Sequence, residues 1–171
     1  IGQLQRKLVW SYLEKITPQL KGLEILELNC GTGEDAILFS EKGFNIVATD
    51  VSEEMLKVTA QKANQFSMQN RITSHYLDLD SVDETVFDKK FDLIFSNFGG
   101  LNCISPESMQ KLMRKIPKLL SSEGRFVAVI MPKFCLWESL YFLLKLKLLK
   151  IFRRWTSKDV KADLQGVTIK T

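Results

Sequence analysis

The stretch 25–36, which reads ILELNCGTGEDA, constrains the fold of this chain more than any other. A short apolar run carrying one acid, Glu27, stops at the glycines Gly31 and Gly33, and residues with the pattern of a helix follow. Because glycine has no Cβ, the backbone there can turn sharply and approach a ligand closely. The first N–H groups of the following helix have no partner within the helix and point into the same gap. We therefore expect a strand, a ligand-binding turn and a helix, in that order.

Glu27 narrows the choice of ligand. Its position near the carboxyl end of the expected strand suits it to receive an ammonium group. A pyrophosphate would be repelled by a carboxylate in this place. The junction therefore indicates a ligand with many hydrogen-bond acceptors that also carries a positive charge.

Composition and charge are those of a globular protein. Of the 171 residues, 45% are hydrophobic and 26% charged, which predicts one domain over 1–171. The net charge of +4 neither demands nor excludes nucleic acid. The cysteines Cys30, Cys103 and Cys135 are far apart and form no CxxC pair, which argues against a disulfide framework and a metal site. A reducing, cytoplasmic location is expected.

Neither a signal sequence nor a membrane span is expected. The longest apolar stretch, 136–155, is interrupted by five basic residues. The chain does not begin with methionine, and we expect it to be incomplete at both termini.

Strand patterns alternate with helix patterns along most of the chain, which predicts an α/β fold with a doubly wound, mostly parallel sheet and helices on both faces. Helices are expected at 3–16, at 34–42 with Gly43 as the stop signal, from the N-cap Ser52 to about residue 66, and at 106–120, where Pro117 should bend or end the helix. Strands are expected at 23–28, 45–50, 72–77, 91–96 and 125–131.

The carboxyl-terminal part differs in pattern. Residues 137–155 predict a helix with an apolar stripe that includes Leu140, Leu144 and Leu148, with basic residues on the other faces. We interpret 136–165 as a substrate-covering insertion or lid. Transient contact of 137–155 with a membrane surface, or an ordinary core helix with solvated lysines, are alternatives. Residues 166–171 look like the start of another strand.

Five segments in order resemble the class I S-adenosylmethionine-dependent methyltransferases: ILELNCGTGEDA, NIVATDVSEEML, YLDLD, FDLIFSNFGG and LLSSEGRFVAVIM. The resemblance runs from about Leu23 to Met131. It implies a Rossmann-like methyltransferase fold, S-adenosyl-L-methionine as the cofactor, and methyl transfer to a small, apolar or aromatic metabolite.

The resemblance also implies a set of cofactor-binding residues. Glu27 matches the acid that holds the methionine ammonium group, Asp50 the acid that takes both ribose hydroxyls, and Asp78 the acceptor of the adenine amino group. The remaining matches lie along the methionine, the adenine and the sulfonium methyl group. The full set is Glu27, Asn29, Cys30, Gly31, Thr32, Gly33, Asp50, Val51, Met55, Asp78, Leu79, Ser96 and Asn97.

The residues after the fourth expected strand match the acceptor side of the family. Phe98, Gly99, Gly100 and Asn102 are the expected substrate-binding residues, and SNFGGLNC departs from the NPPY-type motif of amino-group methylation on adenine or glutamine. No catalytic residue is assigned. An activated sulfonium methyl group needs mainly alignment with the acceptor, so a missing general base does not argue against catalysis.

Two other functions are compatible with parts of the pattern. Gly31, Gly33 and Ala36 also satisfy the GxGxxG/A motif of NAD(P)-dependent oxidoreductases, although Glu27 and Asp78 weigh against that function. A methyltransferase-like module without turnover could use the tail to bind a membrane surface or RNA, but the basic residues form no continuous stripe, so nucleic acid is disfavoured. The single histidine, His75, is interpreted as structural.

Overall fold

The computed structural model describes residues 2–16, 22–82, 84–131, 161–164 and 167–170. The chain separates into two compact units, 1–129 and 130–171, and each is described by itself. The expected helix over 137–155 lies outside the described residues, so the lid and the single domain over 1–171 stay predictions.

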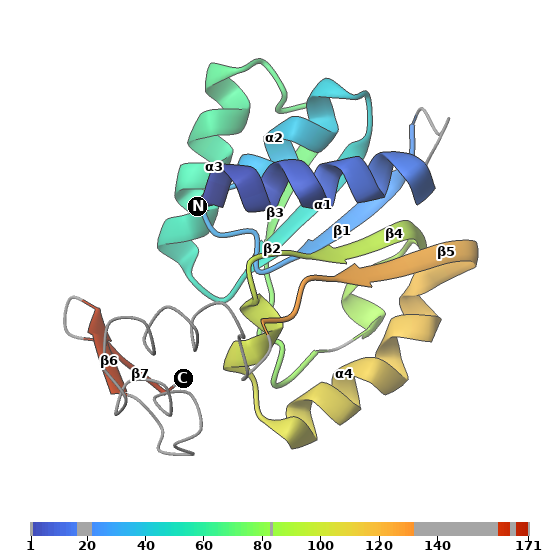
Figure 1. Cartoon of the computed structure of the whole chain (residues 1–171). Helices are drawn as coiled ribbons and strands as arrows, with labels where there is room; N and C mark the ends of the chain where they lie inside the picture. Colours follow the sequence, from blue (N-terminus) through green and yellow to red (C-terminus); the bar gives the residue numbers. More distant parts are fainter. Residues whose placement is uncertain (1, 17–21, 83, 132–160, 165–166, 171) are drawn as a thin grey trace, which may run out of the picture. The chain divides into compact units, whose positions relative to one another are not determined.

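The first unit alternates strands and helices along the chain (Figure 1). Its helices are α1 (Gly2–Ile16), α2 (Glu34–Glu41), α3 (Glu53–Gln65) and α4 (Pro106–Leu119), with short 3₁₀ helices η1 (Glu84–Val86) and η2 (Gly100–Cys103). Its strands are β1 (Glu24–Leu28), β2 (Asn45–Asp50), β3 (Ile72–Tyr76), β4 (Phe91–Ser96) and β5 (Leu120–Ala128).

The five strands form one parallel sheet in the order β3-β2-β1-β4-β5. Helices α1, α2 and α3 cover one face and α4 covers the other (Figure 1). This arrangement confirms the doubly wound α/β prediction. Because the strands are parallel, the carboxyl ends of β1, β2 and β4 meet at one edge of the sheet, with Leu28 in register with both Thr49 and Ser96.

Successive residues of the central strands serve opposite faces of the sheet, as strand geometry requires. Ile25 and Leu93 belong to the apolar cluster under α1, α2 and α3, whereas Leu26 and Ile94 belong to the cluster under α4. All four side chains are almost completely buried. The near-continuous apolar sequence of β1 and β4 follows from this burial on both faces.

Helix α1 buries only part of the apolar face that its spacing predicts, since Leu13 is buried and Val9 and Ile16 pack against the core. Leu4, Leu8 and Tyr12 are 67%, 64% and 55% exposed, while Leu13 is buried. Trp10, which the apolar spacing did not single out, is also buried and packs its ring 4.5 Å from that of Phe39 in α2.

The bounds of strand β5 and of helix α4 differ from those predicted from the sequence. Strand β5 starts at Leu120 and ends at Ala128, whereas the sequence predicted a strand over 125–131. A register shift opposite Phe91–Leu93 accommodates the extra residues. Gly124 permits it, because a Cβ there would lie 2.7 Å from the carbonyl oxygen of Phe91. Helix α4 continues past Pro117 and ends at Leu119.

The second unit contains an antiparallel pair, β6 (Lys161–Leu164) and β7 (Val167–Lys170). The strand expected from residue 166 onward is therefore confirmed for Val167–Lys170, whereas its partner β6 was not anticipated. Among the residues that the structure describes, no helix has the length and apolarity needed to span a bilayer.

Candidate active site

The junction of β1 and α2 is a turn built from left-handed residues. Asn29, Gly31 and Gly33 have φ values of 58°, 54° and 74°. Gly33 packs closely, since a Cβ there would lie 2.6 Å from the Thr59 side chain of α3. Gly31 is open, with nothing within 4 Å of a Cβ built there. The turn therefore rests on α3 at Gly33 and leaves a free side at Gly31, as the sequence predicts for a ligand-binding turn.

Asp50, at the end of β2, links this turn to the start of α3. Its Oδ2 accepts a 2.9 Å hydrogen bond from the Gly31 N–H, and its Oδ1 accepts a 3.0 Å bond from the Ser52 N–H. Ser52 caps α3 by accepting from the Met55 N–H, which confirms the expected N-cap. A carboxylate oxygen can accept two hydrogen bonds, so each Asp50 oxygen keeps a site for a ligand hydroxyl.

Glu27 is buried in the sheet next to this turn. The residue is 2% exposed, and its Oε2 has no hydrogen-bond partner. Burial, and secondarily the negative charge of Asp35, hold the pKa of Glu27 well above its usual range, while Arg6 acts in the opposite direction. A carboxylate in such surroundings is satisfied by a positively charged donor from a ligand.

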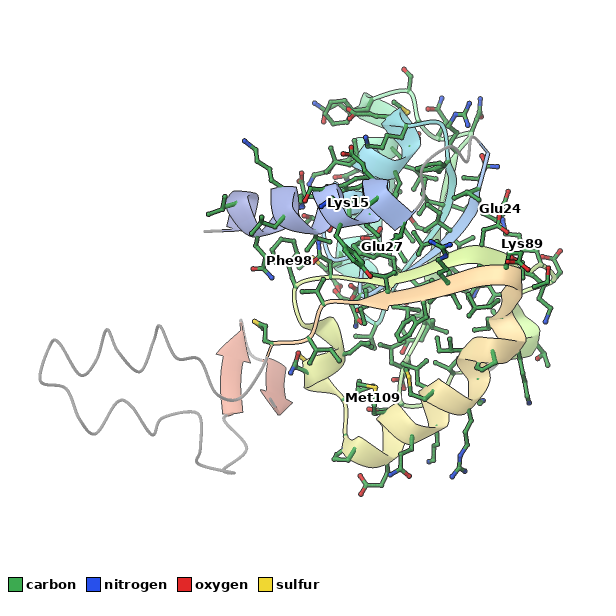
Figure 2. The ribbon with its side chains drawn as sticks, turned by 45° about the vertical axis from the view of Figure 1, so that its right-hand side comes forward. Lys15, Glu24, Glu27, Lys89, Phe98 and Met109 are labelled. Carbon is green, nitrogen blue, oxygen red and sulfur yellow. The ribbon has the colours of Figure 1, made fainter. Side chains whose placement is uncertain are left out.

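Two further buried oxygens lack partners, Oδ1 of Asn29 and Oγ of Ser96. Glu27 is the penultimate residue of β1, Asn29 follows β1, and Ser96 is the last residue of the adjacent strand β4. In Figure 2, Glu27 and Phe98 both lie beneath α1, and Glu24 marks the opposite end of the sheet. Buried polar atoms in proteins are almost always hydrogen-bonded, so this group fits a polar ligand with donor hydrogens. The ammonium end of S-adenosylmethionine has that chemistry.

Apolar side chains are exposed next to Asp50. Val51 is 55% exposed and Met55, in the first turn of α3, is 39% exposed. The Leu77 N–H donates to the Asp50 carbonyl at 3.1 Å, which holds the segment after β3 beside the end of β2. The structure thus brings Val51, Met55 and Asp78 to the edge that carries Asp50.

Two predicted residues of that segment are otherwise engaged. Asp78 is half-buried and accepts from the Asp80 N–H at 2.9 Å and the Ser81 hydroxyl at 3.1 Å. Leu79 is 6% exposed and packs in the apolar cluster under α4. Leu79 is therefore not brought to the surface formed by Val51 and Met55.

The predicted acceptor residues form a tight loop after β4. Phe98 and Gly99 have φ values of 51° and 71°. The Phe98 N–H donates to Oδ1 of the preceding Asn97 at 2.8 Å, and the Gly99 N–H to the Val129 carbonyl at 3.1 Å. Gly100 lies against Asn29, since a Cβ there would be 2.6 Å from that side chain. The loop after β1 and the loop after β4 therefore meet at Asn29 and Gly100. Of the other predicted residues in these loops, Cys30 is buried, whereas Thr32 and Asn102 are exposed.

Three residues of this region were missed by the sequence analysis: Arg6, Trp10 and Asp35. Asp35 is 4% exposed; its Oδ1 accepts from Arg6 Nε at 2.9 Å and from Trp10 Nε1 at 3.1 Å. Its Oδ2 accepts from Asn97 Nδ2 at 2.9 Å. Arg6 and Trp10 are spaced i, i+4 on α1, a signal that places them on one helix face but does not identify their partner.

His75 packs its ring 5.5 Å from that of Phe87, a contact outside the group described above. Within the described residues, no three histidine, cysteine or acidic side chains come together as a metal site would require.

Known proteins resemble this chain in sequence and in fold. A family model described as a methyltransferase domain matches residues 25–124. The candidate methyltransferase YqeM of Bacillus subtilis is 34% identical over 114 residues, which are 66% of this chain and 43% of YqeM. Demethylmenaquinone methyltransferase of Clavibacter sepedonicus is 29% identical over 106 residues, 62% of this chain and 40% of that protein. The solved S-adenosylmethionine dependent methyltransferase of Mesorhizobium loti is 27% identical with a TM-score of 0.61, over 72% of this chain and 54% of that one.

The chain spans less than half the length of the curated relatives it matches. The family match nevertheless covers most of the sheet and the whole β1–α2 junction, and it decides between the two cofactor classes that the glycine motif left open. The chain belongs to the class I S-adenosylmethionine-dependent methyltransferases, through a methyltransferase domain of Rossmann-like fold.

Proposed function

We propose that this protein transfers the methyl group of S-adenosylmethionine to a small, apolar or aromatic acceptor. The observation that carries the proposal is the buried, unpartnered Oε2 of Glu27; Asn29 Oδ1 and Ser96 Oγ, also buried and unpartnered, lie at the same carboxyl edge of the sheet. A ligand ammonium group supplies the charge and the donor hydrogens that these oxygens lack.

The other proposed contacts of S-adenosylmethionine involve residues at the carboxyl edge of the sheet. Asp50 accepts the ribose hydroxyls while it keeps its bonds to Gly31 and Ser52. The adenine ring covers Val51 and Met55. Its flat face removes the exposed apolar surface of these two side chains from water. Asp78 retains acceptor capacity for the adenine amino group. Gly31 gives the methionine part close access to the backbone.

The cofactor supplies an activated methyl group on a sulfonium. The chain's residues have to orient the acceptor atom behind that methyl group and exclude water. Phe98, half-buried after β4, offers an aromatic wall, and Gly99 and Gly100 follow it without side chains. Asn102, exposed in η2, can orient a polar group of the acceptor.

An aromatic acceptor is favoured by the character of this loop. Phe98 presents a ring, and no residue of the loop 98–103 carries a charge that would select an ionic acceptor. One relative is named a demethylmenaquinone methyltransferase, and this name supports an acceptor that contains a ring.

Isothermal titration with S-adenosylhomocysteine, with NADH in a parallel cell, tests the donor. Micromolar binding of S-adenosylhomocysteine without NADH binding is expected. The acceptor class is then tested with labelled S-adenosylmethionine and a panel of 1,4-dihydroxynaphthalene, catechol, phenol and, as a charged contrast, glycine. Binding of NADH alone would overturn the donor assignment, and methylation of glycine but of no aromatic compound would overturn the acceptor class.

A further inference from the structure

We propose that Asp35 is a positioning residue that couples helix α1 to the acceptor loop, defined as residues 98–103; the inference rests on the proposed function because it assigns that loop to the methyl acceptor. Neither Arg6 nor Trp10, the two α1 residues involved, lies within the family match at 25–124.

The first step of the argument is the burial of Asp35. A carboxylate that is 4% exposed needs both charge compensation and hydrogen bonds. Arg6 Nε supplies the charge and one bond at 2.9 Å, and Trp10 Nε1 and Asn97 Nδ2 supply bonds at 3.1 and 2.9 Å. The carboxylate of α2 therefore joins α1 to the residue that follows β4.

The second step is the orientation of Asn97. Its Nδ2 is held by Asp35, which turns its Oδ1 toward the Phe98 N–H at 2.8 Å. Phe98 adopts a φ of 51°, a conformation that is unfavourable for a residue with a side chain. The bond from Asn97 therefore stabilises the loop in this left-handed conformation.

The third step is a second contact from the same pair. The Arg6 guanidinium lies 4.7 Å from the centre of the Phe98 ring, in cation–π geometry. Asp35 thus fixes the Phe98 backbone through Asn97 and the Phe98 ring through Arg6. The bonds of Asp50 to Gly31 and Ser52 involve none of these residues, so loosening Asp35 should leave the proposed ribose contacts in place. The charge of Asp35 does act on the buried carboxyl group of Glu27, whose pKa it raises.

The test compares Asp35→Asn with Glu34→Gln in a chain labelled with [¹⁵N]phenylalanine. Glu34 is an exposed acid in the same turn of α2, paired with Lys62, and it is the matched control. Loss of the charged acceptor should weaken the Asn97 bond, so exchange of the Phe98 amide should accelerate about tenfold in Asp35→Asn. The amides of Phe95 in β4 and Phe39 in α2 should stay within about twofold, and Glu34→Gln should leave all three unchanged.

Equal acceleration at Phe98, Phe95 and Phe39 would show that Asp35 only stabilises the fold, and an unchanged Phe98 amide would show that the loop does not depend on it. Either result overturns the proposal. With whichever aromatic compound of the panel is methylated, Asp35→Asn should lower kcat/KM for the acceptor about tenfold. If the unaltered chain binds no S-adenosylhomocysteine, the proposed function fails while the amide comparison still decides the role of Asp35.

Discussion

The backbone N–H of Gly31 donates a 2.9 Å hydrogen bond to Oδ2 of Asp50. The bond joins the turn after β1 to the end of β2, and the other oxygen of the same carboxylate accepts from the Ser52 N–H at 3.0 Å. Asp50 therefore shapes the turn on which the proposed cofactor rests, in addition to its proposed contact with the ribose. Its loss should affect both the loop and the ligand.

Replacing Asp50 with alanine should weaken S-adenosylhomocysteine binding by about 2 kcal/mol, roughly thirtyfold, because charge-assisted bonds to the ribose are lost. The domain should remain folded, with its free energy of unfolding lowered by about 1–2 kcal/mol because the Gly31 and Ser52 N–H groups lose their acceptor. Isothermal titration and urea denaturation measure the two effects. Glu53→Ala, an exposed acid in the first turn of α3, is the control and should bind normally. Unchanged affinity in Asp50→Ala would refute the ribose assignment.

The parts of the fold that follow from local rules were predictable. Gly43 ends α2 at a φ of 91°, and Ser52 caps α3, as the sequence indicates. Both effects depend on residues within one turn of the helix end. Parallel strands bring their carboxyl ends together, so the acids Glu27 and Asp50 could be placed at one edge before the structure was known.

The parts that depend on tertiary partners were not predictable. Asp35 has the sequence context of a solvated acid in the first turn of a helix, yet it is buried because Arg6, Trp10 and Asn97 happen to surround it. The early start of β5 depends on a register shift opposite Phe91, which no periodicity in the sequence reveals. The apolar spacing of α1 likewise gave no reason for Leu4 to be 67% exposed.

Glu27→Gln should weaken S-adenosylhomocysteine binding about tenfold to a hundredfold, because the ligand ammonium loses a charged acceptor. The same change should raise Tm at neutral pH, because burial disfavours the charged form of Glu27 and the amide carries no charge. Titration and thermal unfolding of the ligand-free chain measure these opposite effects. Glu24→Gln, in the same strand but paired with Lys89 and Asn45 at the far end, should leave the affinity unchanged. A Glu27→Gln variant that binds as tightly as the unaltered chain would contradict the ammonium assignment.

The raised pKa of Glu27 predicts opposite pH dependences for stability and binding. The folded chain holds this proton more tightly than the unfolded chain, so the stability associated with it is present at low pH and is lost as pH rises through the folded pKa. Binding of a ligand ammonium requires the carboxylate, so the affinity for S-adenosylhomocysteine should rise over the same window, between the unfolded value of about 4.3 and the raised value.

Titrations over a series of pH values above about 4.3, in buffers with different ionisation enthalpies, should detect proton release on binding wherever Glu27 is protonated in the free chain. Glu27→Gln should abolish both the proton release and this rise in affinity. A pH profile that is the same in the variant and the unaltered chain would assign the titration to another group.

Gly33→Ala and Gly31→Ala should differ in stability, because both positions have left-handed backbone but only Gly33 faces a neighbour. The φ values are 74° and 54°, so each alanine should cost about 1–2 kcal/mol in backbone strain. At Gly33 the new Cβ would also lie 2.6 Å from the Thr59 side chain, which should add about 1–3 kcal/mol of overpacking. Urea denaturation of the ligand-free variants measures the difference.

Combining Gly33→Ala with Thr59→Ala should recover part of the free energy of unfolding that overpacking removes, because the truncated side chain no longer meets the new Cβ. The loss that comes from backbone strain should remain. Equal losses for the two single variants would mean that α3 moves away from the turn and does not hold Gly33 in place.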